Sequence, residues 1–264
     1  MRLLNYHYYM RLLFSEPVYR HHFTLRCLPR ESDKQRIIKQ RVKIQPAYKG
    51  SPEIDSFGKT CIYGLIEKAH MQFEVDVNGQ ICMQKDRCEV VKDTSKIGMF
   101  RYHTRLTEKG PAIQKIHEKL CTKTFHDPVA QAMDMMESIF QNLCYETGIT
   151  GVKTTAEEAA KLGKGVCQDY AHILLTILRM EHIPCRYVVG MMIGEGASHA
   201  WVELFDGEKW VALDPTNNCV VDDRYICISY GRDANDCTIN QGYFYGSPKQ
   251  NQEIRVVVEE VENG

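Results

Sequence analysis

The sequence of 264 residues lacks a long apolar run, a marked net charge and a CxxC cysteine pair. No apolar stretch approaches the ~18 residues of a membrane span, and the segment from Met1 to Tyr6 lacks the apolar core of a signal peptide. A formal net charge of −1, without a long block of one sign, does not indicate nucleic acid or an anionic membrane as a partner. We therefore expect a cytoplasmic globular protein with no nucleic-acid partner and no membrane partner.

The cysteines predict neither a disulfide framework nor a thiolate zinc site. There are eleven of them, an odd number, and their spacings do not pair. His117 and Cys121 lie four residues apart on a predicted helix and could share a face, but no second pair of ligands accompanies them. We predict no metal and no cofactor, and the sequence does not indicate an oligomeric state.

The first 105 residues are rich in strand patterns. Asn78-Gly79 is a strong hairpin signal, and the basic stretch from Lys34 to Lys43 is typical of a solvated strand face. The predicted strand segments are Tyr6–Phe14, His22–Cys27, Ile37–Gln45, Met71–Val77 and Gln80–Met83. We expect an N-terminal antiparallel β domain over residues 1–105.

Helical signals follow from residue 106 onward. Asp127-Pro128 predicts an N-cap with proline at the first helical position, and Thr155 to Glu158 forms a capping box for a short helix that ends at Gly163. Apolar residues at three- and four-residue spacing predict one buried face of the first of these helices: Val129, Met133, Met136, Ile139, Phe140 and Leu143. We expect a second domain over residues 106–264, packed firmly against the first.

Cys167 is predicted to begin a buried helix. Gly163 and Gly165 break the preceding helix, and the residues from Gln168 to His182 carry one apolar helical face. The free backbone N–H groups of a first helical turn stabilise an anion, so this position favours a thiolate and can hold the oxyanion of a tetrahedral intermediate.

A hairpin is predicted to bring His199 next to Asp214. The strand that begins at His199 is followed by the turn Asp206-Gly207 and a second strand that ends at Asp214. The first residue of one strand and the last of its antiparallel partner are neighbours. Asp214 can then orient the imidazole while the other ring nitrogen faces Cys167. Each residue alone would be commonplace, but together they indicate a cysteine nucleophile with its base and orienting acid.

Four motifs resemble the transglutaminase-like superfamily, and more narrowly its bacterial branch of cysteine-protease-like members. They are Gly165-Val166-Cys167-Gln168-Asp169-Tyr170-Ala171-His172, Ile183-Pro184-Cys185-Arg186-Tyr187-Val188, Ser198-His199-Ala200-Trp201-Val202-Glu203 and Asp214-Pro215-Thr216-Asn217. The resemblance covers roughly residues 140 to 250, and the β-rich front is similar to the N-terminal region of the bacterial members. It implies an α+β, papain-like transglutaminase core in which Cys167, His199 and Asp214 are the catalytic residues.

The resemblance also implies a reaction. We expect a cysteine-dependent amide hydrolase, most simply a peptidase, that acts on a peptide or protein substrate through a thioester acyl-enzyme. One alternative is transglutaminase-type acyl transfer to a primary amine, and a second is a non-catalytic binding module of the same fold.

Further residues beside these motifs have open roles. Tyr145 is a candidate donor to the oxyanion or simply closes a helix end, while Trp201 and Asp169 either line the site or serve packing and helix initiation. Substrate specificity is expected in loops such as residues 190–198, where Gly194-Glu195-Gly196 suggests mobility.

Overall fold

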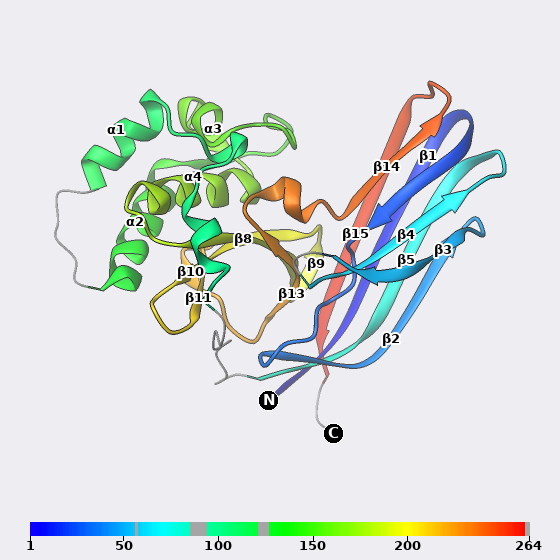
Figure 1. Ribbon diagram of the computed structural model, residues 1–264, viewed down its shortest axis with the longest axis horizontal. Coiled ribbons are helices and arrows are strands. Elements are labelled where there is room, and N and C mark those ends of the chain that lie inside the picture. The colour runs from blue at the N-terminus through cyan, green and yellow to red at the C-terminus, as the bar shows by residue number, and fades with distance from the viewer. Residues whose placement is uncertain (56–57, 85–93, 121–126, 262–264) are drawn as a thin grey trace.

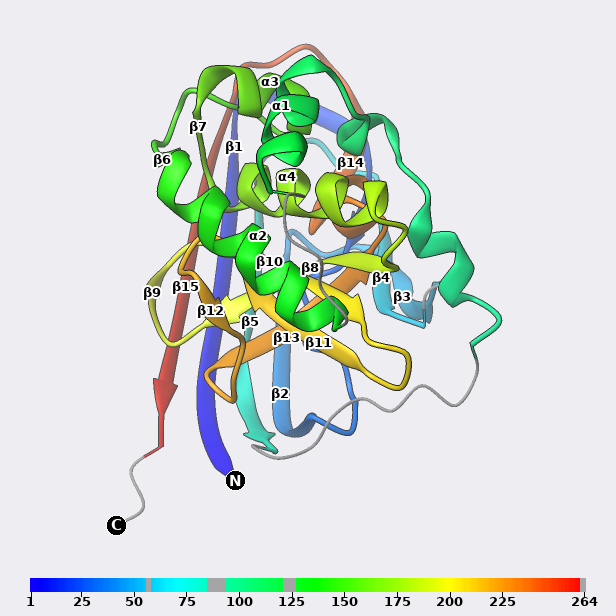
Figure 2. The same cartoon turned by 90° about the vertical axis from the view of Figure 1, so that its left-hand side faces the viewer.

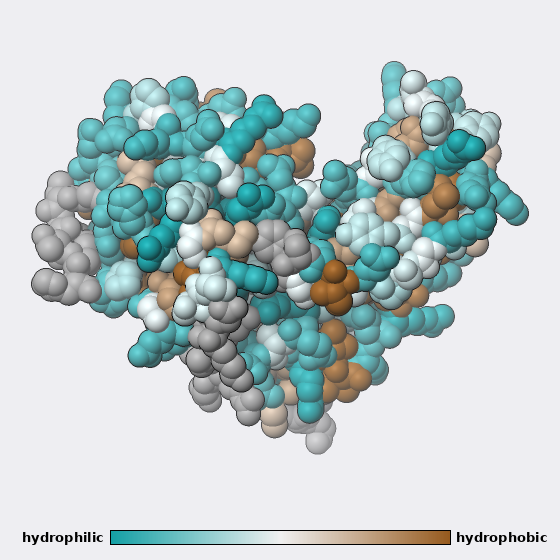
Figure 3. Space-filling model, viewed as in Figure 1, coloured by the Kyte–Doolittle hydropathy of each residue, from teal (hydrophilic) through white to brown (hydrophobic). Residues whose placement is uncertain are grey.

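The computed structural model describes residues 1–55, 58–84, 94–120 and 127–261. It contains a large antiparallel sheet, a smaller antiparallel sheet and a group of helices on one side of the smaller sheet (Figure 1). The fold is therefore α+β, as the sequence predicted. The outline of the molecule is hollowed between the helix-bearing part and the upper strands of the large sheet (Figure 3).

The large sheet takes its strands from both ends of the chain. They are β1 (Arg2–Leu25), β2 (Gln35–Gln45), β3 (Lys49–Ile54), β4 (Thr60–Ile66), β5 (His70–Met83), β9 (Gly194–Gly196), β14 (Asn240–Tyr245) and β15 (Gln250–Glu260).

The long strand β1 organises this sheet. Alternate residues of its first half are buried, as the pattern predicted: Leu4, Tyr6, Tyr8, Met10, Leu12 and Phe14. The two predicted segments Tyr6–Phe14 and His22–Cys27 are parts of one strand, which pairs with β5 and β15 first and with β4 and β14 after an irregularity near Val18. One strand therefore serves two sets of neighbours.

The hairpin predicted at Asn78-Gly79 is wrong, because both residues lie inside the continuous strand β5. A Cβ on Gly79 would lie 2.3 Å from the Lys39 carbonyl oxygen and 2.7 Å from the Tyr6 hydroxyl oxygen. The Tyr6 hydroxyl donates a hydrogen bond to Gln40 on the neighbouring strand. Glycine is required here by the close approach of a side chain and a backbone, and not by a turn.

The smaller sheet carries the motifs identified in the sequence. Its strands, in chain order, are β8 (Cys185–Met192), β10 (His199–Phe205), β11 (Trp210–Asp214), β12 (Cys219–Val220) and β13 (Tyr225–Gly231). The predicted hairpin is confirmed: β10 pairs with β11, and the Asp206 carboxylate caps the turn by accepting from the N–H groups of Glu208 and Lys209.

The helices cover one face of this sheet (Figure 2). The α-helices are α1 (Pro111–Leu120), α2 (Pro128–Asn142), α3 (Ala156–Leu162) and α4 (Cys167–Met180). Shorter elements are the 3-10 helices η1 (Ile97–Arg101), η2 (Arg105–Thr107) and η3 (Ala234–Cys237), and the parallel pair β6 (Cys144–Tyr145) and β7 (Lys164–Gly165).

The predicted helix boundaries hold. The Asp127 carboxylate caps α2 by accepting from the N–H groups of Val129 and Ala130, and Thr155 and Glu158 form the capping box of α3. Gly163 ends α3 with a positive φ of 64°.

The predicted buried face of α2 is only partly correct. Met133 and Phe140 are 42% and 44% exposed. The buried stripe runs instead through Ala132, Met135, Met136 and Ile139. Two of the six predicted residues thus lie one position away from the side that packs on α4, because amphipathic spacing does not specify which neighbour covers a helix.

The predicted continuous domain over residues 106–264 does not hold at its C-terminal end. Strands β14 and β15 return to the N-terminal sheet and pair with β1, and β9 pairs with β15 from Gly194 to Gly196. The glycine-containing segment that suggested mobility is therefore a strand held in the large sheet. Met191, Ile226 and Ile228 of the smaller sheet belong to the core of the larger one, so the two parts share apolar packing.

Candidate active site

Cys167 is the first residue of α4, as the sequence predicted. Gly163 stops α3, the short strand β7 follows, and Val166 is the N-cap of α4. The Asp169 carboxylate accepts a hydrogen bond from the Val166 backbone N–H at 2.8 Å, which closes the first turn. Because the rest of α4 is buried, the helix start is held rigidly against the smaller sheet.

His199 and Asp214 meet across the β10–β11 hairpin. Nε2 of His199 and Oδ2 of Asp214 are 2.7 Å apart, although the residues are 15 positions apart in the chain. His199 is the first residue of β10 and Asp214 the last of β11, and the pairing of these strands, with Val202 opposite Leu213, brings their ends near each other.

Cys167 lies near enough to His199 to contribute to the pKa of its imidazole. Since Nε2 is engaged by Asp214, Nδ1 is the ring nitrogen left to face the sulfur. Burial lowers the pKa of His199, but interactions with Asp214 and Cys167 outweigh it and raise the pKa to about 9. The imidazole is therefore held as imidazolium at neutral pH, which favours a neighbouring thiolate.

Asp214 is fully buried and richly hydrogen-bonded. Its Oδ2 accepts from His199, from the Asn217 side chain at 2.7 Å and from the Tyr225 hydroxyl at 3.0 Å. Its Oδ1 accepts from the backbone N–H groups of Thr216 and Asn217. Burial raises the pKa of Asp214, but the hydrogen bonds hold it below its usual range, so the carboxylate stays ionised.

Tyr225 was missed by the sequence interpretation. It comes from β13, at the far edge of the smaller sheet, and no local motif connects it to Asp214. Asn217 lies in the motif that begins at Asp214, and its side chain and backbone both serve the carboxylate. An Asx-type turn after an aspartate could have indicated the role of Asn217.

Trp201 packs behind the imidazole. Its ring is near-parallel to that of His199, with centroids 6.5 Å apart, and Tyr225 contacts it edge-on at 5.6 Å. A Cβ on Gly190, which pairs with His199, would lie 2.5 Å from the Trp201 ring. Trp201 is thus a buried wall that fixes the orientation of His199.

Tyr145 and Asp169 flank the thiol in different ways. Tyr145 is about half exposed in β6, which pairs with the β7 strand that leads to Cys167. Burial and the nearby Cys167 raise the pKa of Tyr145, so its hydroxyl stays protonated and available as a donor. Asp169 accepts from Thr150 at 2.7 Å as well as from Val166, and therefore braces the loop against the helix start.

No cluster of metal ligands occurs in the part of the chain that the structure describes. His117 pairs with Glu181 at 2.5 Å, and Cys121 lies outside the described residues. The nine cysteines in the described segments are all free thiols.

Comparisons with known proteins agree with this architecture. The family model described as the transglutaminase-like superfamily matches residues 115–215, and the one described as the bacterial transglutaminase-like N-terminal region matches residues 4–81. Among solved structures, one titled "Putative Cysteine Protease from Cytophaga hutchinsonii" superposes with a TM-score of 0.83 at 18% identity, covering 100% of this chain and 92% of that chain. The likeness shows a shared fold.

Sequence relatives span nearly the whole chain. An uncharacterized protein of Mycobacterium leprae is 28% identical over 254 residues, which cover 89% of each chain. An uncharacterized protein of Mycobacterium tuberculosis is 26% identical over 265 residues, which cover 88% of this chain and 84% of that protein. The chain belongs to the transglutaminase-like superfamily, with a transglutaminase-like core preceded by a bacterial transglutaminase-like N-terminal region.

Proposed function

We propose that the protein is a cysteine-dependent amide hydrolase, a peptidase in which Cys167 is the nucleophile, His199 the general base and acid, and Asp214 the orienting carboxylate. The observation that carries the proposal is the arrangement of these groups: the His199 imidazole forms a hydrogen bond of 2.7 Å with Asp214, and Cys167 lies near enough to contribute to its pKa. The helix start beneath the sulfur adds backbone N–H groups for the oxyanion.

The reaction proceeds in two halves. The Cys167 thiolate attacks the carbonyl carbon, and Tyr145 and the N–H groups of the helix start stabilise the oxyanion that forms. As the C–N bond breaks, the His199 imidazolium gives its proton to the departing amine, which leaves a thioester on Cys167. His199 then takes a proton from water as the hydroxide attacks the thioester, and the acid product leaves with Cys167 regenerated.

Asp214 keeps the imidazole in one orientation throughout. Because Oδ2 also accepts from Asn217 and Tyr225, the carboxylate cannot turn away from His199 without losing two further hydrogen bonds. Transfer to a primary amine would use the same first half and differ only in the group that attacks the thioester.

A substrate profile tests the proposal. The wild-type protein and Cys167→Ala are incubated with a peptide library, with and without a labelled primary amine, and products are identified by mass spectrometry. We expect peptide cleavage that requires Cys167 and proceeds without the amine. Amine incorporation faster than hydrolysis would replace the peptidase with an acyl transferase. Identical behaviour of both proteins on every peptide would contradict an enzymatic role.

The cellular location stays a prediction from the sequence. No helix among the described residues has both the length and the apolar character needed to cross a bilayer.

A further inference from the structure

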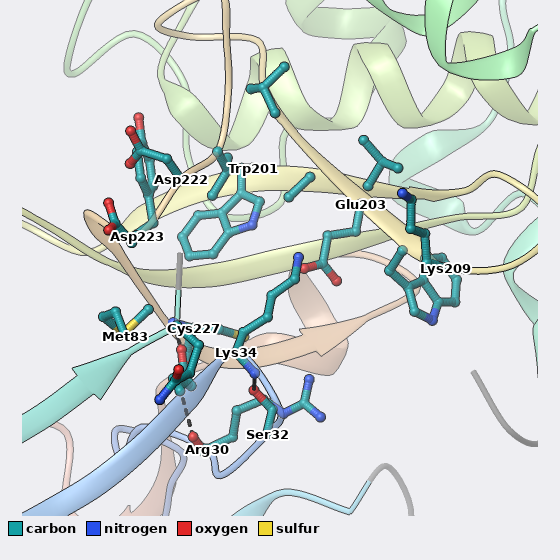
Figure 4. A pocket seen from close by; sticks show the side chains of 18 residues that line it. Arg30, Ser32, Lys34, Met83, Trp201, Glu203, Lys209, Asp222, Asp223 and Cys227 are labelled. Carbon is teal, nitrogen blue, oxygen red and sulfur yellow. Dashed lines mark hydrogen bonds between the residues drawn. The ribbon is translucent and has the colours of Figure 1, made fainter. Parts of the chain in front are cut away.

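A cavity of about 230 Å³ lies on the face of the smaller sheet that is turned away from the helices (Figure 4). Its walls come from the loop before β2, the end of β5, and strands β10, β11 and β13. Both parts of the protein therefore contribute to it. Cys167, His199 and Asp214 are not among the residues that line it.

A buried hydrogen-bond donor opens into this cavity. Trp201 is 1% exposed, and its Nε1 has no hydrogen-bond partner in the described segments of the chain. In Figure 4 the indole nitrogen is directed toward the space beside the Lys34 ammonium group. Because buried polar groups in native proteins are almost always paired, we expect a ligand or a water molecule to accept from this N–H.

Among the described residues, two lysines of the lining form no ion pair with a carboxylate, Lys34 and Lys209, and Figure 4 draws the Lys34 ammonium group nearer the indole nitrogen of Trp201. Each lining carboxylate has its own arginine partner: Glu203 with Arg186, Asp223 with Arg2, and Asp222 with Arg224. Lys34 has no carboxylate partner within the described residues. An ammonium and an indole N–H thus face the same space without acceptors.

We propose that this cavity binds a small monocarboxylate. Its two oxygens accept from the Trp201 indole N–H and the Lys34 ammonium, two donors that face the same part of the cavity. Its apolar body packs on the apolar part of the wall, which includes Met83, Ala212 and Val221. A single negative charge suits the site better than the double charge of phosphate, because three carboxylates also line the cavity.

The cavity and the candidate active site share two residues, Trp201 and Tyr225. Trp201 lines the cavity and packs on His199, and Tyr225 lines it and donates to Asp214. A bound carboxylate would therefore contact the two side chains that hold the imidazole and its carboxylate in place.

Intrinsic fluorescence tests the proposal. The chain has two tryptophans, Trp201 and Trp210, and both line this cavity. The full-length protein is titrated with butanoate, with acetate and with inorganic phosphate at constant ionic strength. We expect a saturable change in emission with butanoate, a weaker one with acetate and none with phosphate. Trp210→Phe, which leaves Trp201 as the only reporter, is expected to retain the butanoate response.

Two lysine variants provide the matched comparison. Lys34→Gln is expected to weaken butanoate binding about tenfold or more, because it removes the charge-assisted hydrogen bond, and Lys34→Arg is expected to retain binding. Lys43→Gln, at an exposed position of β2, serves as the control and is expected to bind as the wild type does. Circular dichroism confirms that each variant is folded, and butanoate should raise the melting temperature of the wild type but not of Lys34→Gln.

Three results would overturn the proposal. They are the absence of a saturable response to either carboxylate in the wild-type protein, equal butanoate affinity in folded Lys34→Gln, and phosphate binding as tight as that of butanoate. The first would mean that no carboxylate reaches the indole N–H, the second that Lys34 does not bind the carboxylate, and the third would exclude the monocarboxylate class.

Discussion

Replacing Asp214 by asparagine tests the active-site arrangement most directly. The substitution keeps the volume of the side chain but removes its charge. It also changes its hydrogen bonding, because the native carboxylate only accepts, at both oxygens. An amide accepts at one heavy atom only, so its NH₂ group must face donors on one side of the site. His199 would lose its anion and its fixed orientation together.

The magnitude follows from the pKa of His199. Its rise from 6.5 to about 9, despite burial, corresponds to about 3 kcal/mol in favour of the imidazolium. The hydrogen bond with Asp214 comes first among the interactions that raise the pKa of His199 against the effect of burial. Without it, we expect His199 to be largely neutral at pH 7 and the rate of peptide cleavage, as kcat/KM, to fall about 10²- to 10⁴-fold.

Site-resolved alkylation measures the effect without a known substrate. Iodoacetamide modification of each cysteine is followed by mass spectrometry from pH 5 to pH 9. In the wild type we expect Cys167 to react faster than every other cysteine at pH 6, including the exposed Cys144. Burial raises the pKa of Cys27 and Cys237 to about 12 and that of Cys185 to about 11, so these thiols do not compete.

The expected result is a loss of the Cys167 advantage in Asp214→Asn. Its alkylation rate at pH 6 should fall at least about tenfold, while that of Cys144 stays constant. Glu208→Gln, in the exposed turn of the same hairpin, is the control and should behave as the wild type. Unchanged alkylation of Cys167 in a folded Asp214→Asn protein would refute the electrostatic reasoning.

Further outcomes follow from the same structure. Tyr225→Phe removes one of the hydrogen bonds to Asp214 and should lower kcat/KM about fivefold to tenfold with little change in melting temperature. Gly79→Ala forces a Cβ into contacts below 3 Å and should destabilise the fold by about 1–3 kcal/mol in urea unfolding, whereas Gly98→Ala, where a Cβ meets nothing within 4 Å, should be nearly neutral. The pKa of His199 is about 9 in the folded state, above its usual 6.5, so protonation of His199 stabilises the fold by about 3 kcal/mol. This stabilisation is complete below pH ~6.5 and is lost as the pH rises through 9. The melting temperature of His199→Ala should therefore vary less than that of the wild type between pH 7 and pH 10.

Local sequence rules were sufficient for the start of the helix and for the hairpin. The glycines before Cys167 and the apolar periodicity after it specify a helix that begins at the cysteine, and an Asp-Gly turn specifies the register that joins His199 to Asp214. These features involve residues within about one helix or one hairpin of each other, so propensity and periodicity suffice. Local rules could not predict the distance between Cys167 and His199, because it depends on how α4 packs on the smaller sheet.

The sequence alone determined which residue types meet in the candidate site, whereas the tertiary structure decided what surrounds them. Tyr225 reaches Asp214 from another strand. Strand β15 returns to the N-terminal sheet and pairs with the segment from Gly194 to Gly196. A local signal also failed at Asn78-Gly79. The pair indicated a turn, but it lies inside strand β5, where the Tyr6 side chain packs against Gly79. Each of these features depends on segments far apart in the chain whose pairing is selected by shared burial, and burial is a property of the assembled fold.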